Sequence, residues 1–276
     1  MKTAIALLLL SAVLAVGATI PFNADKGLVL VPVSLDNRVT GMFGIDTGAD
    51  GLYIDRQFAL DHNLIDPDRS PQRLVAGISG STAGVFTNLR SLAIGDERMY
   101  NLQAVVIDMN AVSNDAPGNH PDGLIGYEVL SRLYVTVDYP GQSIQLHVTR
   151  PPEIESGQCR EVPFEIRKHL IVVEVGFPNG LKRPMILDYC ASFTAVSPEL
   201  AEELGLDGPA GSVHSVGTIT LKGGVSTDNV RAVVTDLSEY AASVGSVSFD
   251  GILGGSFLYH HKFTVSYKQK RIYVHD

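Results

Sequence analysis

The sequence predicts an all-β fold made of two similar lobes that are related by a pseudo-two-fold axis, each with a short helix. Three features support this prediction: short runs rich in β-branched residues dominate, helical patterns are brief, and a long stretch of the first half recurs in the second. The chain has 276 residues, enough for one large β domain or for two smaller lobes.

The N-terminal stretch has the order of a secretory signal peptide. Lys2 is followed by an apolar run over residues 4–16 and by the small residues Gly17 and Ala18. A buried helix or an uncleaved anchor is the alternative, but the run is short for an anchor and ends in small residues. We therefore expect residues 1–18 to be a signal peptide, which makes the mature protein secreted or periplasmic. No later stretch is long and apolar enough to span a bilayer, so we expect no membrane contact after cleavage.

The elements that follow are mostly strands. "LVLVPVSL" (residues 28–35) and "LIVVEVGF" (residues 170–177) are strands by their β-branched content, and turn-forming Asn, Pro or Gly residues follow each. Residues 55–64 and 197–206 have brief helical patterns. In the second of these, Ser197 is the expected N-cap, because Pro follows it at the first helical position.

Two pairs of segments reveal an internal repeat. Residues 122–146 align without gaps on residues 250–274, and both begin Asp-Gly, two apolar residues, Gly. "FGIDTGADG" (residues 43–51) likewise matches "MILDYCASF" (residues 185–193), and the turn-rich residues 108–120 account for the greater length of the first half. The repeat predicts an N-terminal lobe over residues 19–150, an exposed linker over residues 151–159 and a C-terminal lobe over residues 160–276. A site is expected at the lobe interface.

The first copy of the motif is the more informative. "IDTGAD" (residues 45–50), followed by an apolar-Gly-Leu-Ile-Gly segment and a strand, resembles the retropepsin-like, retroviral-type family of aspartic proteases. The resemblance spans nearly all of the mature chain, as a single-chain, two-lobe form whose second motif is degenerate, Asp-Tyr-Cys. It implies two retropepsin-like lobes and an aspartic endopeptidase that cleaves a peptide or protein substrate.

The chemistry of such a site requires two carboxyl groups. Two carboxylates placed close together cannot both ionise, so the pair holds one proton. The ionised member takes a proton from water, and the protonated member donates one to the scissile carbonyl. The resemblance implies that Asp46 and Asp188 are this catalytic pair. Because one chain carries both, we expect a monomer.

The resemblance also assigns supporting roles. In the family, the Thr of each motif crosses to the opposite motif and locks the two loops together, and a glycine-rich hairpin covers the cleft. The expected loop-support residues are Thr47, Gly48, Ala49, Tyr189, Cys190 and Ala191, and the expected substrate-binding residues are Asp50, Gly77, Ile78 and Gly80. Residues 75–85 are the first candidate hairpin, and residues 213–225 the second. The Gly-x-x-Gly segments at residues 123–126 and 251–254 are assigned to the scaffold.

The second motif departs from the pattern at two positions. Tyr189 is too large for the small Thr site, which predicts that the symmetrical lock cannot form. Cys190 adds a Cβ where Gly is usual, at a cost of about 1 kcal/mol if the backbone there has a positive φ. Three hypotheses stay open: a protease with an asymmetric Asp pair, a pseudoprotease that binds a peptide or protein, and pairing of first lobes between two chains. The presence of Asp188 favours the first.

Composition and motifs exclude other classes. The net charge of −9 argues against binding to nucleic acid. The sequence has no CxxC, no HExxH, no P-loop and no Gly-x-Ser-x-Gly, so no metal and no cofactor are expected. His260 and His261 are interpreted as surface or structural residues. Whether Cys159 and Cys190 form a disulfide is left open.

Overall fold

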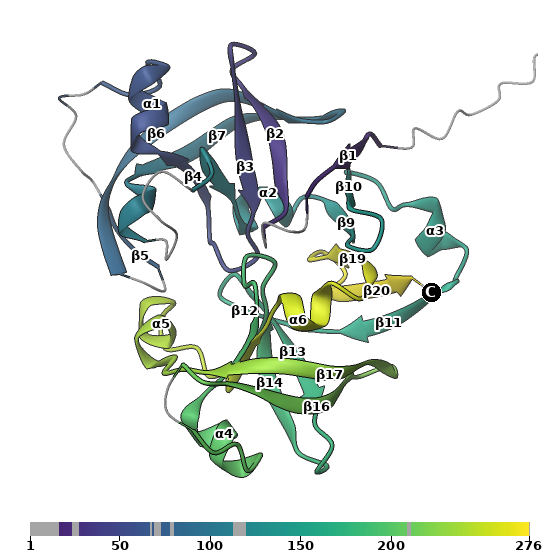
Figure 1. Ribbon diagram of the computed structural model, residues 1–276. Coiled ribbons are helices and arrows are strands. Elements are labelled where there is room, and N and C mark those ends of the chain that lie inside the picture. The colour runs from purple at the N-terminus through teal and green to yellow at the C-terminus, as the bar shows by residue number, and fades with distance from the viewer. Residues whose placement is uncertain are drawn as a thin grey trace, which may run out of the picture.

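The computed structural model describes residues 17–23, 28–66, 68, 73–77, 80–112, 120–208 and 211–275. Two β lobes stand on opposite sides of a central sheet (Figure 1). The all-β, two-lobe prediction is therefore confirmed. All but the last two residues of the expected signal peptide lie outside the described residues. None of the described helices has the length and apolar character needed to cross a bilayer.

The first lobe is a strongly curved sheet with short helices. Within the described residues it has seven strands in the order β2 (Leu30–Leu35), β3 (Val39–Ile45), β8 (Gly123–Ile125), β4 (Leu52–Asp55), β7 (Glu97–Ile107), β6 (Gly80–Ile94), β5 (Arg73–Gly77). An additional pairing of β2 with β6 curls the sheet toward closure. The helices are α1 (Arg56–Asp61), η2 (Met109–Ala111) and α2 (Tyr127–Leu130).

The second lobe repeats this plan. Its described strands run in the order β12 (Glu165–Arg167), β13 (Leu170–Gly176), β14 (Lys182–Leu187), β18 (Gly251–Leu253), β15 (Thr194–Val196), β17 (Val225–Val234), β16 (Val213–Leu221). Its helices are α4 (Pro198–Glu203), α5 (Ser238–Ser243) and α6 (Gly255–Leu258). Ser197 caps α4 through a hydrogen bond from the Leu200 backbone N–H, as the sequence predicts.

Strand register confirms the duplication. In the first lobe β3 runs parallel to β8 with Ile45 opposite Ile125, and in the second β14 runs parallel to β18 with Leu187 opposite Leu253. These are the strand ends that precede the two Asp motifs. Because the paired strands are equivalent in the two lobes, the two motifs leave their sheets at equivalent points.

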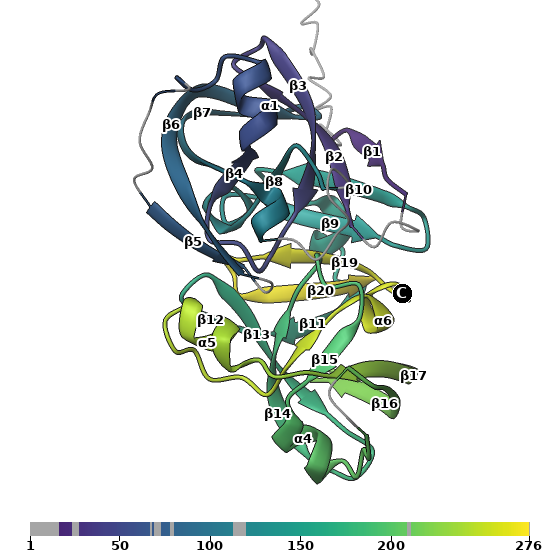
Figure 2. The same cartoon turned by 60° about the vertical axis from the view of Figure 1, so that its left-hand side comes forward.

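A third sheet joins the lobes. Its six described strands run β1 (Thr19–Pro21), β10 (Ser143–His147), β9 (Tyr134–Asp138), β19 (Lys262–Ser266), β20 (Arg271–His275), β11 (Cys159–Pro163), and Figure 2 shows it lying between the lobes. The strands β9 and β19, from opposite repeats, pair antiparallel at its centre. There Thr136 and Thr264, equivalent residues of the repeat, share a buried hydrogen bond of 2.8 Å between their Oγ1 atoms. This shared sheet fixes the position of one lobe against the other.

The connection between the repeats is more structured than a plain linker. Residues 151–159 contain α3 (Pro152–Glu155), and Ile154 is buried against Tyr134 and Tyr273 of the central sheet. Cys159 already belongs to β11. It does not form a disulfide with Cys190, which lies on the loop after β14. The connection is thus anchored by packing and strand pairing.

We predict that Thr264→Val destabilises the protein by about 1–3 kcal/mol. Thr264 Oγ1 lies 2.8 Å from both Thr136 Oγ1 and His275 Nε2, and the substitution leaves these two groups without their buried partner. Chemical denaturation measures the change. The double variant Thr136→Val with Thr264→Val should cost less than the sum of the two single variants. Thr40→Val, at an exposed position of β3, is the control, and an equally large loss there would contradict the assignment.

Candidate active site

The two Asp motifs lie at the ends of equivalent strands. The Asp46 N–H donates to Ile125 O at 2.9 Å, and the Asp188 N–H donates to Leu253 O at 3.1 Å. Gly126 and Gly254 lie behind these loops, where a Cβ would approach carbonyl oxygens of the loops to within 2.4 and 2.3 Å. The glycines of the Gly-x-x-Gly segments therefore allow the loops to pack closely, which agrees with their expected scaffold role.

The carboxyl groups of both motifs face one cleft. Asp46 Oδ1 accepts hydrogen bonds from the backbone N–H groups of Gly48 (2.8 Å) and Ala49 (3.1 Å). Asp188 Oδ1 accepts one from Cys190 N–H at 2.9 Å. A Cβ built on Gly48 would lie 3.1 Å from Asp188 Oδ2 and 3.2 Å from Asp46 Oδ1, so both carboxyl groups approach the same point. Gly48 is needed there because a side chain would crowd them.

Burial changes the acidity of both carboxyl groups. Burial raises the pKa of Asp46 to about 6, although hydrogen bonds from Gly48, Ala49 and Cys190 oppose the rise. Burial and then the negative charge of Asp46 raise the pKa of Asp188 to about 7. Asp46 has more donors and is the easier of the two to ionise, while Asp188 is the better holder of the proton.

The crossing between the two loops is asymmetric. Thr47 Oγ1 donates to Leu187 O at 2.9 Å and accepts from Tyr189 N–H at 3.1 Å, so the first half of the lock is complete. In the second half, Cys190 Sγ donates to Ile45 O at 3.4 Å. The symmetrical lock of two Thr side chains is thus absent, and the residue after Tyr189 supplies the second donor in its place.

Tyr189 and Cys190 cause no backbone strain. Neither has a positive φ, so the predicted Cβ penalty at position 190 does not arise. Tyr189 is fully buried and turns into the core, where its ring lies 5.3 Å from that of Phe263. The large side chain thus fills the interior behind the loop.

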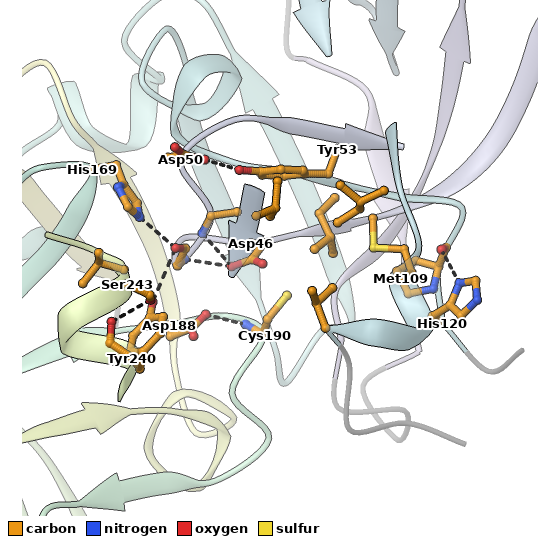
Figure 3. Close-up of a pocket in the computed structure, with 18 of the residues that line it drawn as sticks. Asp46, Asp50, Tyr53, Met109, His120, His169, Asp188, Cys190, Tyr240 and Ser243 are labelled. Carbon is orange, nitrogen blue, oxygen red and sulfur yellow. Dashed lines mark hydrogen bonds between the residues drawn. The ribbon is translucent and has the colours of Figure 1, made fainter. Parts of the chain in front are cut away.

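The cleft has a volume of about 650 Å³ and is lined by both lobes (Figure 3). Asp46, Gly48, Ala49, Asp50, Asp188, Cys190 and Ala191 all line it. Thr47 and Tyr189 are buried behind it. The structure thus brings together seven of the expected site residues in one space.

The first candidate hairpin reaches the cleft. Val75, the first residue of this hairpin, lines the cleft together with the preceding Leu74 of β5, and Gly77 pairs with Gly80 where β5 and β6 meet. Ile78 lies outside the described residues. The second candidate does not reach the cleft: among the described residues that line it, none belongs to β16 or β17. Helix α5 takes that place and lies beside β5 in Figures 1 and 2.

Asp50 is held by two neighbours that sequence reasoning missed. Tyr53 donates a hydrogen bond to Asp50 Oδ1, and Arg73 Nη2 lies 2.5 Å from Asp50 Oδ2. Burial alone would raise the pKa of Asp50, but these hydrogen bonds and the guanidinium charge lower it. Asp50 is thus a fixed anion on the cleft wall, and its ion pair with Arg73 joins the β5–β6 hairpin to the first loop.

Two further residues that the sequence did not reveal come from the second lobe. His169 Nε2 donates to Gly48 O at 2.9 Å, which requires the proton on Nε2, and Tyr240 OH approaches the same carbonyl at 3.4 Å. Burial lowers the pKa of His169. Both residues orient the first loop across the lobe interface. Neither lies in a repeated motif, so no sequence signal marks them.

No group of three or more His, Cys, Asp or Glu side chains in the described part of the chain is arranged to hold a metal ion. The groups that the structure does place together in the cleft are the two carboxyl groups and the backbone and side-chain donors around them.

Comparisons with known proteins agree with this geometry. No curated protein matches the chain. Among solved structures, the aspartic proteinase from Irpex lacteus superposes over 94% of this chain and 97% of its own, with a TM-score of 0.59 and 12% sequence identity, which shows a shared fold. The model of an aspartyl protease family matches residues 31–129 and 172–257, one segment in each lobe. The chain therefore belongs to the aspartyl protease family.

Proposed function

We propose that the protein is an aspartic endopeptidase, in which Asp46 and Asp188 activate water to hydrolyse a peptide bond. The observation that carries the proposal is the pair of buried carboxyl groups in one cleft, both with a raised pKa. Such a pair holds one proton near neutral pH, as general acid–base catalysis requires.

The difference between the two environments assigns the roles. Asp46, with backbone donors from Gly48 and Ala49, is the ionised base that takes a proton from the water. The water oxygen then attacks the carbonyl carbon while Asp188 gives its proton to the carbonyl oxygen. The resulting diol collapses: Asp46 returns the water proton to the leaving nitrogen, the C–N bond breaks, and a diol proton returns to Asp188. Each carboxyl group ends the cycle as it began.

The same proposal extends to the substrate and to the location of the protein. A peptide or protein segment occupies the cleft under the β5–β6 hairpin, with Asp50, Gly77, Ile78 and Gly80 as binding residues. One chain supplies both carboxyl groups, so a monomer suffices. We propose that the mature protein is secreted or periplasmic; β1 begins at Thr19, directly after the expected cleavage point.

The second motif favours an alternative, in which the cleft binds a peptide or protein without cleaving it. Its two substitutions remove the Thr and Gly that the first loop uses. Incubation with a mixed peptide pool at several pH values separates the two functions. Cleavage that a statine-type inhibitor blocks supports the protease. Peptide binding with no cleavage at any pH supports the pseudoprotease.

We predict that Asp46→Asn and Asp188→Asn each abolish peptide cleavage, because the first loses the base and the second loses the acid. Mass spectrometry of a digested peptide pool measures the loss. Asp96→Asn, in the exposed turn between β6 and β7, is the matched control and should cleave like the parent. An active Asp188→Asn beside an inactive Asp46→Asn would favour a site formed by two first lobes.

We predict that the same two variants stabilise the fold above neutral pH. Folding raises the pKa of both carboxyl groups above the value near 3.8 that applies to the unfolded chain. Such a group contributes its full stability at a pH below that unfolded-state pKa. That stability is lost as pH rises through the folded values of about 6 and about 7. Replacing either group by neutral Asn should add on the order of 2 kcal/mol at pH 8 and much less at pH 3. Thermal unfolding at both pH values measures this, and equal changes at both would contradict it.

We predict a bell-shaped pH dependence of kcat/KM with its maximum between about pH 6 and pH 7, where the pair holds one proton. At lower pH both groups are protonated and the base is lost, whereas at higher pH both are ionised and the acid is lost. Initial rates from pH 3 to pH 9 measure the profile. A rate that rises steadily to pH 9 would exclude this mechanism.

A further inference from the structure

The two halves of the lock between the catalytic loops are built from different positions. Thr47, one residue after Asp46, donates to the carbonyl that precedes Asp188. Cys190, two residues after Asp188, donates to the carbonyl of Ile45, which precedes Asp46. The two acceptors are equivalent in the repeat, but the donors are shifted by one residue along the chain.

Packing explains the shift. The ring of Tyr189 is fully buried against Phe263, so its side chain is committed to the core and cannot cross to the first loop. At the equivalent position of the first loop a side chain would be crowded, because a Cβ on Gly48 would lie 3.1 Å from both Asp188 Oδ2 and the Tyr240 hydroxyl. The second loop carries the side chain of Cys190 at this position.

We propose that the Cys190 thiol is a positioning residue, which replaces the hydroxyl that a Thr at position 189 would supply and holds the Asp46 loop against the second lobe. This inference rests on the proposed peptidase function. Figure 3 shows the sulfur on the side of Cys190 that faces Asp46. The thiol is a weaker donor than a hydroxyl, but S–H···O=C at 3.4 Å is within hydrogen-bond range.

The thiol also acts on the charge of Asp46. The thiol has one proton, which it gives either to Ile45 O or to the carboxyl group of Asp46. A hydrogen bond to Asp46 favours the ionised carboxylate and lowers the pKa of Asp46 against the larger effect of burial. Asp46 is therefore the member of the pair that the second loop helps to ionise. The titratable groups that face Asp46 or its loop are Asp188, Cys190, Tyr53, Tyr240, Tyr267 and His169.

The test compares Cys190→Ala, which removes the donor, with Cys190→Ser, which keeps one. Kinetics on a cleaved peptide should show kcat reduced by about 10-fold to 100-fold in Cys190→Ala at similar KM, because a displacement of about 1 Å costs ~10² in rate. Cys190→Ser should recover most of kcat. Cys159→Ala, on β11 away from the cleft, is the control and should match the parent.

A second readout does not require activity. In protein labelled with carbon-13 at the Asp carboxyl groups, the Asp46 signal is identified by its loss in Asp46→Asn, and its titration is followed by NMR. The Asp46 midpoint should move upward by about half a pH unit in Cys190→Ala, the equivalent of losing about 0.7 kcal/mol of stabilisation of the carboxylate, and stay near the parent in Cys190→Ser.

The outcomes separate the two proposals. An unchanged Asp46 midpoint and unchanged kcat in Cys190→Ala would overturn the positioning role and leave the peptidase intact. A parent without activity would overturn the peptidase, while a shifted midpoint in Cys190→Ala would still establish the contact of the thiol with Asp46. Equal losses in Cys190→Ala and Cys190→Ser, with a lowered melting temperature in both, would mean that Cys190 only fills space.

Discussion

Two acidic side chains buried in one cleft set the constraint on which this structure depends. Asp46 and Asp188 are removed from water, and the charge of Asp46 makes ionisation of Asp188 harder still. Burying a carboxylate costs free energy unless hydrogen-bond donors are fixed around it. The backbone N–H groups of both loops supply those donors, and they do so only because the loops are held rigidly at the ends of β3 and β14.

Rigidity comes from contacts between the repeats. The central sheet aligns the lobes through β9 and β19, and Thr136 meets Thr264 where the repeats pair. Nearer the cleft, Thr47 and Cys190 cross between the loops, and His169 and Tyr240 hold the Gly48 carbonyl from the second lobe. Each contact joins one half of the duplication to the other, so the site exists only when both halves are folded together.

The duplication has not kept the two loops alike. The first loop uses a small hydroxyl and a glycine, whereas the second uses a buried aromatic ring and a thiol. This division gives Asp46 more hydrogen-bond donors than Asp188 and pushes their proton affinities apart. An asymmetric pair of this kind can assign fixed acid and base roles, which a symmetric pair shares between its members.

The sequence by itself determined the repeat, the two-lobe β fold and the positions of Asp46 and Asp188, because strand periodicity and the glycine-bearing motifs are local signals. The resemblance of the first motif to retropepsin-like proteases also pointed to Asp50 and to the hairpin that the structure builds from β5 and β6. The tertiary structure alone decided the roles of Cys190, His169 and Tyr240. Their partners lie between 121 and 192 residues away in the chain, and no local pattern encodes a contact over that separation. The sequence also misplaced the second element at the cleft. Helix α5 stands between β17 and β18, where the first lobe has η2 between β7 and β8, but no local pattern marks it as part of the cleft, and only packing against β5 places it there.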